Sequence, residues 1–202
     1  MNSEVKYPVM ETFTSVQGEG VHTGVPSFFI RLAGCDVGCV WCDVKESWDK
    51  EKHPLVSLET LVEAAVGSGV KVVIVTGGEP TMHDLAPLTE ALRNVGLRIH
   101  LETSGTQKLT GLFDWITFSP KKFKAPLAEY FQLSNELKVV ISHKSDIEWS
   151  HALSARMNEN AQWFMQPEWE KRETMLLLIF DWVLKNPHWR VGLQIHKYMG
   201  VE

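Results

Sequence analysis

The chain has 202 residues, of which 44% are hydrophobic and 22% are charged, with a formal net charge of −5 at pH 7. This composition excludes a disordered chain and is typical of a globular protein with a sizeable core, which we expect to form one domain over residues 1–202. The negative charge argues against nucleic-acid and polybasic membrane binders, although it leaves room for a local basic pocket.

Seven strands are predicted along the chain, each a mostly continuous apolar run that ends in a polar or glycine-rich cluster. Such runs are typical of parallel strands buried on both faces. In chain order they cover Ser27–Ala33, Lys71–Thr76, Arg98–Glu102, Trp115–Ser119, Glu136–Ser142, Ala161–Gln166 and Arg190–His196.

Helices are predicted between several of these strands. Ser57 is the expected N-cap of the first helix, and Asp84 is expected to cap a second helix that ends at Gly96. The later helices are predicted over Ser145–Met157 and Trp169–Lys185. Only short irregular segments are expected near residues 103–114 and 120–135.

Alternating strands and helices predict a mostly parallel sheet with right-handed crossovers. Polar residues gather where the strands end, for example at Thr76–Glu79, Glu102–Gly105 and Ser119–Lys121. A site built from many strand ends is the arrangement of a (β/α) barrel, of which a complete eight-fold form usually needs about 250 residues. We therefore expect an α/β fold with a partial, open (β/α) barrel.

All three cysteines lie within one short loop, residues 34–43, which follows the first predicted strand. Cys35, Cys39 and Cys42 have the spacing C-x3-C-x2-C. Three thiolates can hold three corners of a four-iron cluster, and the missing fourth cysteine would leave one iron open for a substrate or cofactor. A zinc site with three cysteines and one histidine, or merely buried thiols, are the alternatives, but zinc usually takes a second cysteine pair.

An odd number of cysteines fits poorly with the disulfide framework of a secreted protein. Residues 1–6 lack the apolar segment of a secretory signal, and no apolar run approaches the roughly 18–20 residues that span a bilayer. We therefore expect a reduced, cytoplasmic protein with no membrane contact.

The cysteine loop, with Trp41 before its last cysteine, resembles the radical S-adenosylmethionine (SAM) superfamily. The segment Thr76–Pro80 resembles the GGEP motif of that superfamily, whose fold is a full or partial (β/α) barrel. The resemblance implies a [4Fe–4S] cluster on the three cysteines, with SAM chelated to the open iron. Glycines at a strand end expose backbone groups to SAM, and Glu79 can accept a hydrogen bond from its ammonium group.

Longer segments resemble the 7-carboxy-7-deazaguanine synthase family nearly from end to end: Glu11–Gly20, Gly24–Pro26, Phe29–Cys35, Glu102–Gly105, Ser119–Lys121, Gln166–Pro167 and Gln194–Glu202. The resemblance implies a lyase that converts 6-carboxy-5,6,7,8-tetrahydropterin into a 7-deazapurine precursor of queuosine-type nucleosides, with loss of ammonia. SAM would supply a 5′-deoxyadenosyl radical that abstracts hydrogen from C6, and would then be regenerated. A reductant such as flavodoxin and a homodimer are also implied, and no nucleic-acid partner is expected.

The resemblance also implies which residues bind SAM and the substrate. A pterin edge suits backbone and amide groups, while its carboxylate needs a cation, for which Arg31 is the best candidate. The expected SAM-binding residues are Trp41, Cys42, Asp43, Gly78, Glu79, Ser104, Ser119, Pro120, Lys121, Gln166 and Pro167. The expected substrate-binding residues are Val16, Gln17, Gly18, Arg31, Thr76, His196 and Glu202. The alternatives are a structural salt bridge for Arg31 and a satisfied core histidine for His196.

One residue departs from the pattern of the family. The family usually has Cys-Asp-Thr after the third cysteine, and its threonine hydroxyl binds Mg2+ beside the substrate carboxylate. Here Val44 stands at that position and has no side-chain oxygen, although Mg2+ requires oxygen ligands. Either water, Ser47 or Asp43 takes over, or magnesium matters less in this chain.

Two other functions are compatible with the cysteine loop. A short activase that makes a glycyl radical on a partner protein carries the same cysteine spacing, but it gives no reason for the segments Gln17–Gly20 and Gln194–Lys197. A metal-stabilised binding module without catalytic activity is the second alternative. Zinc at one per chain would favour this module.

Overall fold

The fold is described from a computed structural model, which covers residues 5–201. Within this range the strands form one nine-stranded sheet in the order β3-β1-β2-β4-β5-β6-β7-β8-β9. From β2 to β9 all neighbouring strands are parallel, whereas β1 is antiparallel to both β2 and β3. The strands are β1 (Lys6–Val16), β2 (Pro26–Leu32), β3 (Leu55–Ser57), β4 (Val72–Gly77), β5 (Arg98–Thr103), β6 (Trp115–Phe118), β7 (Glu136–Ile141), β8 (Gln162–Pro167) and β9 (Trp189–Val191).

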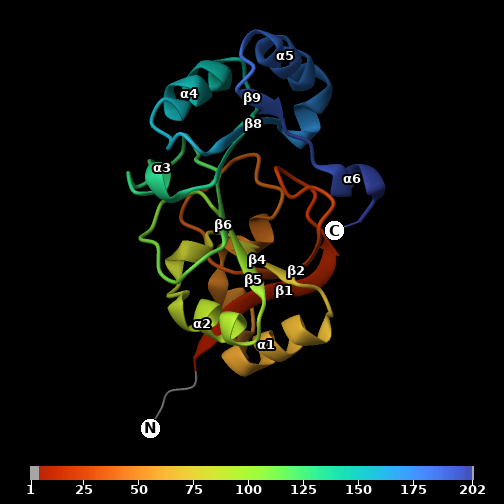
Figure 1. Cartoon of the computed structure of the whole chain (residues 1–202), viewed down its shortest axis with the longest axis vertical. Coiled ribbons are helices and arrows are strands. Elements are labelled where there is room, and N and C mark those ends of the chain that lie inside the picture. Colours follow the sequence, from red (N-terminus) through yellow and green to blue (C-terminus); the bar gives the residue numbers. More distant parts are fainter. Residues whose placement is uncertain (1–4, 202) are drawn as a thin grey trace.

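Two pairs of longer helices lie at opposite ends of the long axis of the molecule, and two short helices lie between them (Figure 1). The first pair packs beside β1, β2, β4 and β5, and the second pair packs beside β7, β8 and β9. In chain order the helices are α1 (Leu58–Gly67), α2 (Ala86–Asn94), α3 (Tyr130–Leu133), α4 (Ser145–Ser154), α5 (Arg172–Lys185) and α6 (Ile195–Met199). Short 3-10 helices cover Lys45–Trp48, Lys50–Lys52, Pro80–Met82 and Trp169–Lys171.

Successive side chains of a strand point to opposite faces of the sheet, and this alternation separates the core from the interior of the partial barrel. In β2, Phe28, Ile30 and Leu32 are buried in the core that α1 and α2 cover. Between them, Phe29 packs on the inner face and Arg31 lines the interior cavity. The helices therefore stabilise one face of the sheet while the other face is free to carry polar groups.

The predicted α/β fold with a partial, open barrel is confirmed, because the sheet is open and its neighbouring strands from β2 to β9 are all parallel. All seven predicted strands are present, with boundaries that differ by a few residues. Ser57 is the N-cap of α1 as predicted, since its hydroxyl accepts from the backbone N–H of Thr60 at 3.2 Å. Asp84 lies one position before the N-cap of α2 and accepts from the N–H of Ala86 at 3.1 Å.

Five elements differ from the sequence prediction. The strands β1 and β3 were not predicted, and β1 is the longest strand in the described part of the chain. The last strand ends at Val191, and its predicted continuation to His196 enters α6 instead. The helix α3 lies in a segment that was predicted to be irregular. None of the helices between residues 5 and 201 has the length and apolar character that crossing a membrane requires.

Candidate active site

A cavity of about 590 Å³ opens at the carboxyl ends of the parallel strands. Its wall combines the loop after β1, the cysteine loop after β2, the ends of β4, β5, β7 and β8, and the segment that leads into α6. Carboxyl ends of parallel strands meet at one edge of the sheet, so residues that are far apart in the sequence come together here. This is the edge at which polar clusters were predicted.

The cysteine loop, residues 34–43, places all three thiols on the wall of this cavity. Its start is held by two backbone bonds, from the N–H of Gly34 to the carbonyl of Ser47 at 2.7 Å and from Cys35 to Trp48 at 3.2 Å. A tight turn follows, in which the N–H of Cys42 donates to the carbonyl of Cys39 at 3.0 Å. Burial raises the pKa of the Cys39 thiol to about 11.

The donor set of this loop fits an iron–sulfur cluster. Thiolates are the usual ligands of such clusters, and three of them face one cavity here. Within residues 5–201, no three side chains of His, Cys, Asp or Glu are arranged around a single metal ion. A four-iron cluster distributes its cysteine ligands over different iron atoms, so its ligands need not converge on one point.

The glycine-rich turn after β4 packs directly against the cysteine loop. The N–H of Gly78 donates to the carbonyl of Leu32 at 2.9 Å, and the N–H of Glu79 donates to the carbonyl of Gly34 at 2.7 Å. There is no room for a side chain at Gly78, because a Cβ atom there would lie 2.3 Å from the carbonyl oxygen of Gly34 and 2.9 Å from the Cβ of Cys35. Position 78 therefore requires glycine for the two loops to touch.

The Glu79 side chain joins the ends of β4 and β5. It is 1% exposed, and its Oε1 accepts from the Thr81 N–H at 3.1 Å, the Thr81 hydroxyl at 2.6 Å and the Thr103 hydroxyl at 2.5 Å. Its Oε2 accepts from the N–H of Ser104 at 2.8 Å and from the Ser104 hydroxyl. Glu79 thus contributes five hydrogen bonds to the frame of the site, and a ligand ammonium group would have to share or replace one of them.

Arg31 lies on the cavity wall at the end of β2, where it faces Glu11 of the neighbouring strand. The two residues are directly opposite in the antiparallel register, and Arg31 Nε donates to Glu11 Oε1 at 2.7 Å. The guanidinium also lies 5.6 Å from the ring centroid of Phe13. Arg31 therefore forms an ion pair, as the salt-bridge alternative predicts, and it also lines the cavity, as a substrate contact must.

The loop after β6 also packs against the cysteine loop. Lys121 Nζ donates to the Ser119 hydroxyl at 2.6 Å and lies 5.7 Å from the ring centroid of Trp41. Burial lowers the pKa of Lys121 to about 8. Lys124 forms an ion pair with Asp36, which lies between the first two cysteines. These contacts fix the position of the cysteine loop.

The segment around α6 closes the cavity on the C-terminal side. His196 packs against Gly18 so closely that a Cβ on this glycine would lie 1.9 Å from Nδ1 of the histidine. Burial lowers the pKa of His196. Lys197 Nζ donates to Asp43 Oδ2 at 2.7 Å, which ties α6 to the cysteine loop.

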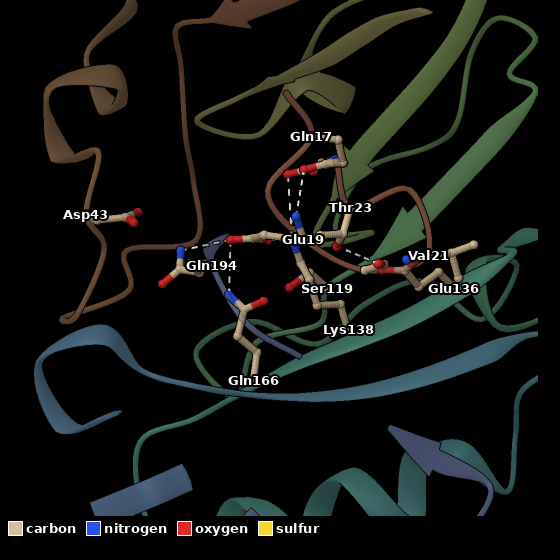
Figure 2. A network of polar contacts seen from close by, with 12 residues as sticks. Gln17, Glu19, Val21, Thr23, Asp43, Ser119, Glu136, Lys138, Gln166 and Gln194 are labelled. Atoms are coloured by element: carbon tan, nitrogen blue, oxygen red, sulfur yellow. Dashed lines mark hydrogen bonds and ion pairs between the residues drawn. The ribbon is translucent and has the colours of Figure 1, made fainter. Parts of the chain in front are cut away.

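A polar network that the sequence analysis did not predict lies across the cavity wall (Figure 2). Glu19 Oε1 accepts from Gln194 Nε2 at 2.8 Å and from Gln166 Nε2 at 3.1 Å, and Glu19 Oε2 accepts from Lys138. Glu102 Oε1 accepts from Gln17 Nε2 at 2.8 Å. Glu19, Glu102, Lys138 and Gln194 all line the cavity.

Of the residues expected to bind SAM or substrate, all but two line this cavity. Pro120 is buried but does not line the cavity, and Glu202 lies outside the described residues. Glu102 belongs to the polar cluster that was predicted at the end of β5, although no binding role was assigned to it. Lys138 lies in the middle of β7 and gives no such signal.

Comparisons with known proteins agree with this geometry. The family model of the radical SAM superfamily matches residues 29–121. The chain is 50% identical over 197 residues to the 7-carboxy-7-deazaguanine synthase of Synechocystis sp., covering 98% of this chain and 94% of that protein. It is 48% identical to the enzyme of the same name from Flavobacterium psychrophilum, covering 96% of this chain and 92% of that protein. The crystal structure of QueE from Escherichia coli superposes with a TM-score of 0.84 at 33% identity, over 94% of each chain.

Proposed function

Because the chain belongs to the 7-carboxy-7-deazaguanine synthase family of the radical SAM superfamily, we propose that it converts 6-carboxy-5,6,7,8-tetrahydropterin into 7-carboxy-7-deazaguanine with loss of ammonia. This is a carbon–nitrogen lyase reaction in the biosynthesis of queuosine-type 7-deazapurines. The observation that carries the proposal is a single cavity in which three thiols, an oriented guanidinium and several amides lie together. The glycyl-radical activase and the binding module are not favoured, because relatives of this name align over nearly the whole chain.

The radical SAM superfamily implies a [4Fe–4S] cluster and SAM. We assign Cys35, Cys39 and Cys42 as the cluster ligands. For SAM we assign the cavity-lining members of the expected set: Trp41, Cys42, Asp43, Gly78, Glu79, Ser104, Ser119, Lys121, Gln166 and Pro167. When bound, these two groups supply the one-electron chemistry that starts the reaction. The chain itself contributes the orientation of the bound groups and the exclusion of water.

The substrate carboxylate is assigned to Arg31. Glu11 engages the Nε edge of the guanidinium and so orients it, and the other edge suits a bidentate bond to a carboxylate. Gln17, Gly18 and Thr76 line the same cavity and offer amide and backbone groups to the pterin edge. Val16 and His196 complete the proposed substrate wall.

The side chains around Val44 do not fit a magnesium ion. Val44 lines the cavity without an oxygen atom, and the Ser47 hydroxyl is fully buried and donates to the carbonyl of Val44 at 2.7 Å. Asp43 already pairs with Lys197. Since Mg2+ requires oxygen ligands, we derive no role for it in this chain.

The reaction needs a reductant, as radical SAM enzymes do, and we propose a flavodoxin-type protein for this role. Free thiols and an iron–sulfur cluster suit a reducing compartment, so the cytoplasm is part of the same proposal.

A homodimer also belongs to the proposal, with α5 as its contact surface. Leu177, Phe180 and Leu184 are exposed along one face of this helix, which has Glu173 in its first turn and Lys185 in its last. An antiparallel pair of these helices about a two-fold axis would bring opposite charges together at both ends. Light scattering should show that Leu177→Glu converts the dimer to a monomer, whereas the equally exposed Leu112→Glu leaves it dimeric. If both variants remain dimeric, the exposed face of α5 is not the dimer contact.

The decisive experiment is anaerobic reconstitution with iron and sulfide, followed by mass spectrometry of the products formed from SAM and the carboxytetrahydropterin. We expect about four iron atoms per chain and the deazaguanine product. Cys39→Ala should lose the brown colour and the cleavage of SAM together. A Cys39→Ala variant with full activity would overturn the cluster assignment, and one zinc per chain would favour a binding module.

A further inference from the structure

One buried lysine connects five segments of the cavity wall. Lys138 is 5% exposed, and its ammonium group donates to the Glu19 carboxylate and lies 3.6 Å from Glu102 Oε2. Lysine is rarely buried unless it is paired, and here two carboxylates face it. Glu19 also accepts hydrogen bonds from Gln166 and Gln194. The ammonium group on β7 is therefore connected, directly or through Glu19, to four other segments: the loop after β1, the end of β5, the end of β8 and the segment before α6.

The contacts close into a ring of hydrogen bonds and one ion pair. The backbone N–H of Glu19 donates to Gln17 Oε1 at 3.1 Å, and Gln17 Nε2 donates to Glu102 Oε1 at 2.8 Å. Glu102 returns to Lys138, which completes the ring. The Gln17 side chain, an expected substrate contact, is therefore oriented at both ends by this network.

The charge of Glu19 decides how the neighbouring amides are oriented. An ionised carboxylate only accepts hydrogen bonds, so it selects the NH2 end of each glutamine and turns the carbonyl end away. A protonated carboxyl carries one donor, which can pair with an amide carbonyl instead. Protonation of Glu19 would therefore weaken its bonds to Gln166 and Gln194 and allow one of these amides to turn over.

We propose that Lys138 is a positioning residue: it keeps the Glu19 carboxylate ionised and thereby fixes the orientation of two glutamine amides in the cavity wall. The proposal rests on the proposed function, because that function assigns this wall to SAM and the pterin. Lys138 acts through Glu19, so its removal should impair substrate binding while leaving the cysteine loop intact.

The electrostatics of the cluster support this role. Burial alone would raise the pKa of Glu19, but the charge and hydrogen bond of Lys138, with the bond from Gln194, lower it to about 2. Burial alone would lower the pKa of Lys138, and the carboxylates of Glu102 and Glu19 raise it instead. The other titratable groups that face Glu19 are Glu136 on β7, Lys121 after β6 and His196 on α6.

Replacing Lys138 by methionine removes the opposing charge. Burial and repulsion from the carboxylates are then opposed only by the bond from Gln194 and by His196, so the pKa of Glu19 rises. Glu19 then becomes protonated in an acidic range of pH in which it is ionised in the wild type. The KM for the carboxytetrahydropterin should rise about tenfold at the acidic end of a pH series, because charge-assisted bonds that orient the amides are lost. As the pH increases, Glu19 ionises again and KM should fall towards the value of the wild type.

Two further variants isolate Glu19 as the responsible group. Glu19→Gln should raise KM without this pH-dependent step, and the double variant Lys138→Met, Glu19→Gln should be equally flat. Infrared spectra, which need no substrate, should show a protonated carboxyl band in Lys138→Met that is absent from the double variant. Both spectra are recorded in a Glu136→Gln background, because burial raises the pKa of Glu136 to about 7 and its own carboxyl band would overlap.

Each result decides the proposal. A wild-type KM at every pH in Lys138→Met, or identical carboxyl bands in the two variants, would overturn it. A lowered melting temperature with no pH-dependent change in KM would do the same, since it indicates structural support only. If Lys138→Met does not fold, an unchanged KM in Glu19→Gln overturns the proposal. If the wild type does not convert the pterin, the proposed function fails, and the infrared comparison still tests Lys138.

Discussion

Substituting Gly78 by alanine should force the glycine-rich turn away from the cysteine loop. The added Cβ would lie 2.3 Å from the carbonyl oxygen of Gly34, whereas real Cβ contacts do not fall below 3.0 Å, so the loops must separate by at least about 0.7 Å. That movement stretches the 2.7 Å bond from the N–H of Glu79 to Gly34 and displaces Cys35 beside it. Overpacking of this kind costs about 1–3 kcal/mol, which lowers the melting temperature of a chain this size by roughly 2–12 °C.

The assay for Gly78→Ala has two readouts, the melting temperature of the apo protein and the iron bound per chain after anaerobic reconstitution. Both should fall, because the substitution strains the frame and moves the first cysteine. Gly67→Ala is the matched control, since a Cβ at this position in α1 meets nothing within 4 Å. If Gly78→Ala binds as much iron as Gly67→Ala and melts at the same temperature, the reasoning from this close contact is refuted.

Three further substitutions test other parts of the structure. Arg31→Lys keeps the charge but loses the planar pair of donors, so the KM for the pterin should rise while SAM binding is retained. If the affinities for the pterin and for SAM fall equally, the ion pair of Arg31 with Glu11 supports the fold instead. In a Mg2+ titration of EDTA-treated enzyme, the initial rate of Val44→Thr should depend on Mg2+ more steeply than that of the wild type. If the wild type already requires Mg2+ strongly and the substitution does not change this, another residue supplies the missing oxygen ligand. Ser57→Ala removes the acceptor for the N–H of Thr60 and should destabilise α1 by about 1 kcal/mol, measured as a fall of about 2–4 °C in melting temperature; an unchanged value would show that the cap contributes nothing.

The parallel strands were predictable because each is a short apolar run between polar clusters. The strand β1 was missed because it is antiparallel and half-exposed, and its polar residues, with Pro8 among them, interrupt any apolar run. The helix α6 was missed because its five residues, Ile195–Met199, are too few to show a helical period. In both cases tertiary contacts, rather than local pattern, determine the structure.

The candidate site was predictable wherever its residues follow a strand. Thr76, Ser104 and Gln166 lie at strand ends, and parallel strands end at the same edge of a sheet. The pair of Lys138 and Glu19 was not predictable, because 119 positions separate the two residues and a lysine inside a strand is usually exposed. Only the register of β7 turns its side chain towards the interior.

The links between α6 and the early loops also set an order for folding. Lys197 is 154 positions from its partner Asp43, and the N–H of Ile195 donates to the carbonyl of Gly18 at 2.9 Å. The ribosome makes the cysteine loop well before these closing residues, and domains form native contacts only between segments that have already emerged. A growing chain therefore presents its three thiols to the surrounding solution before the wall that encloses them exists. The contacts that close the cavity can therefore form only after the nine strands that precede α6 have been translated.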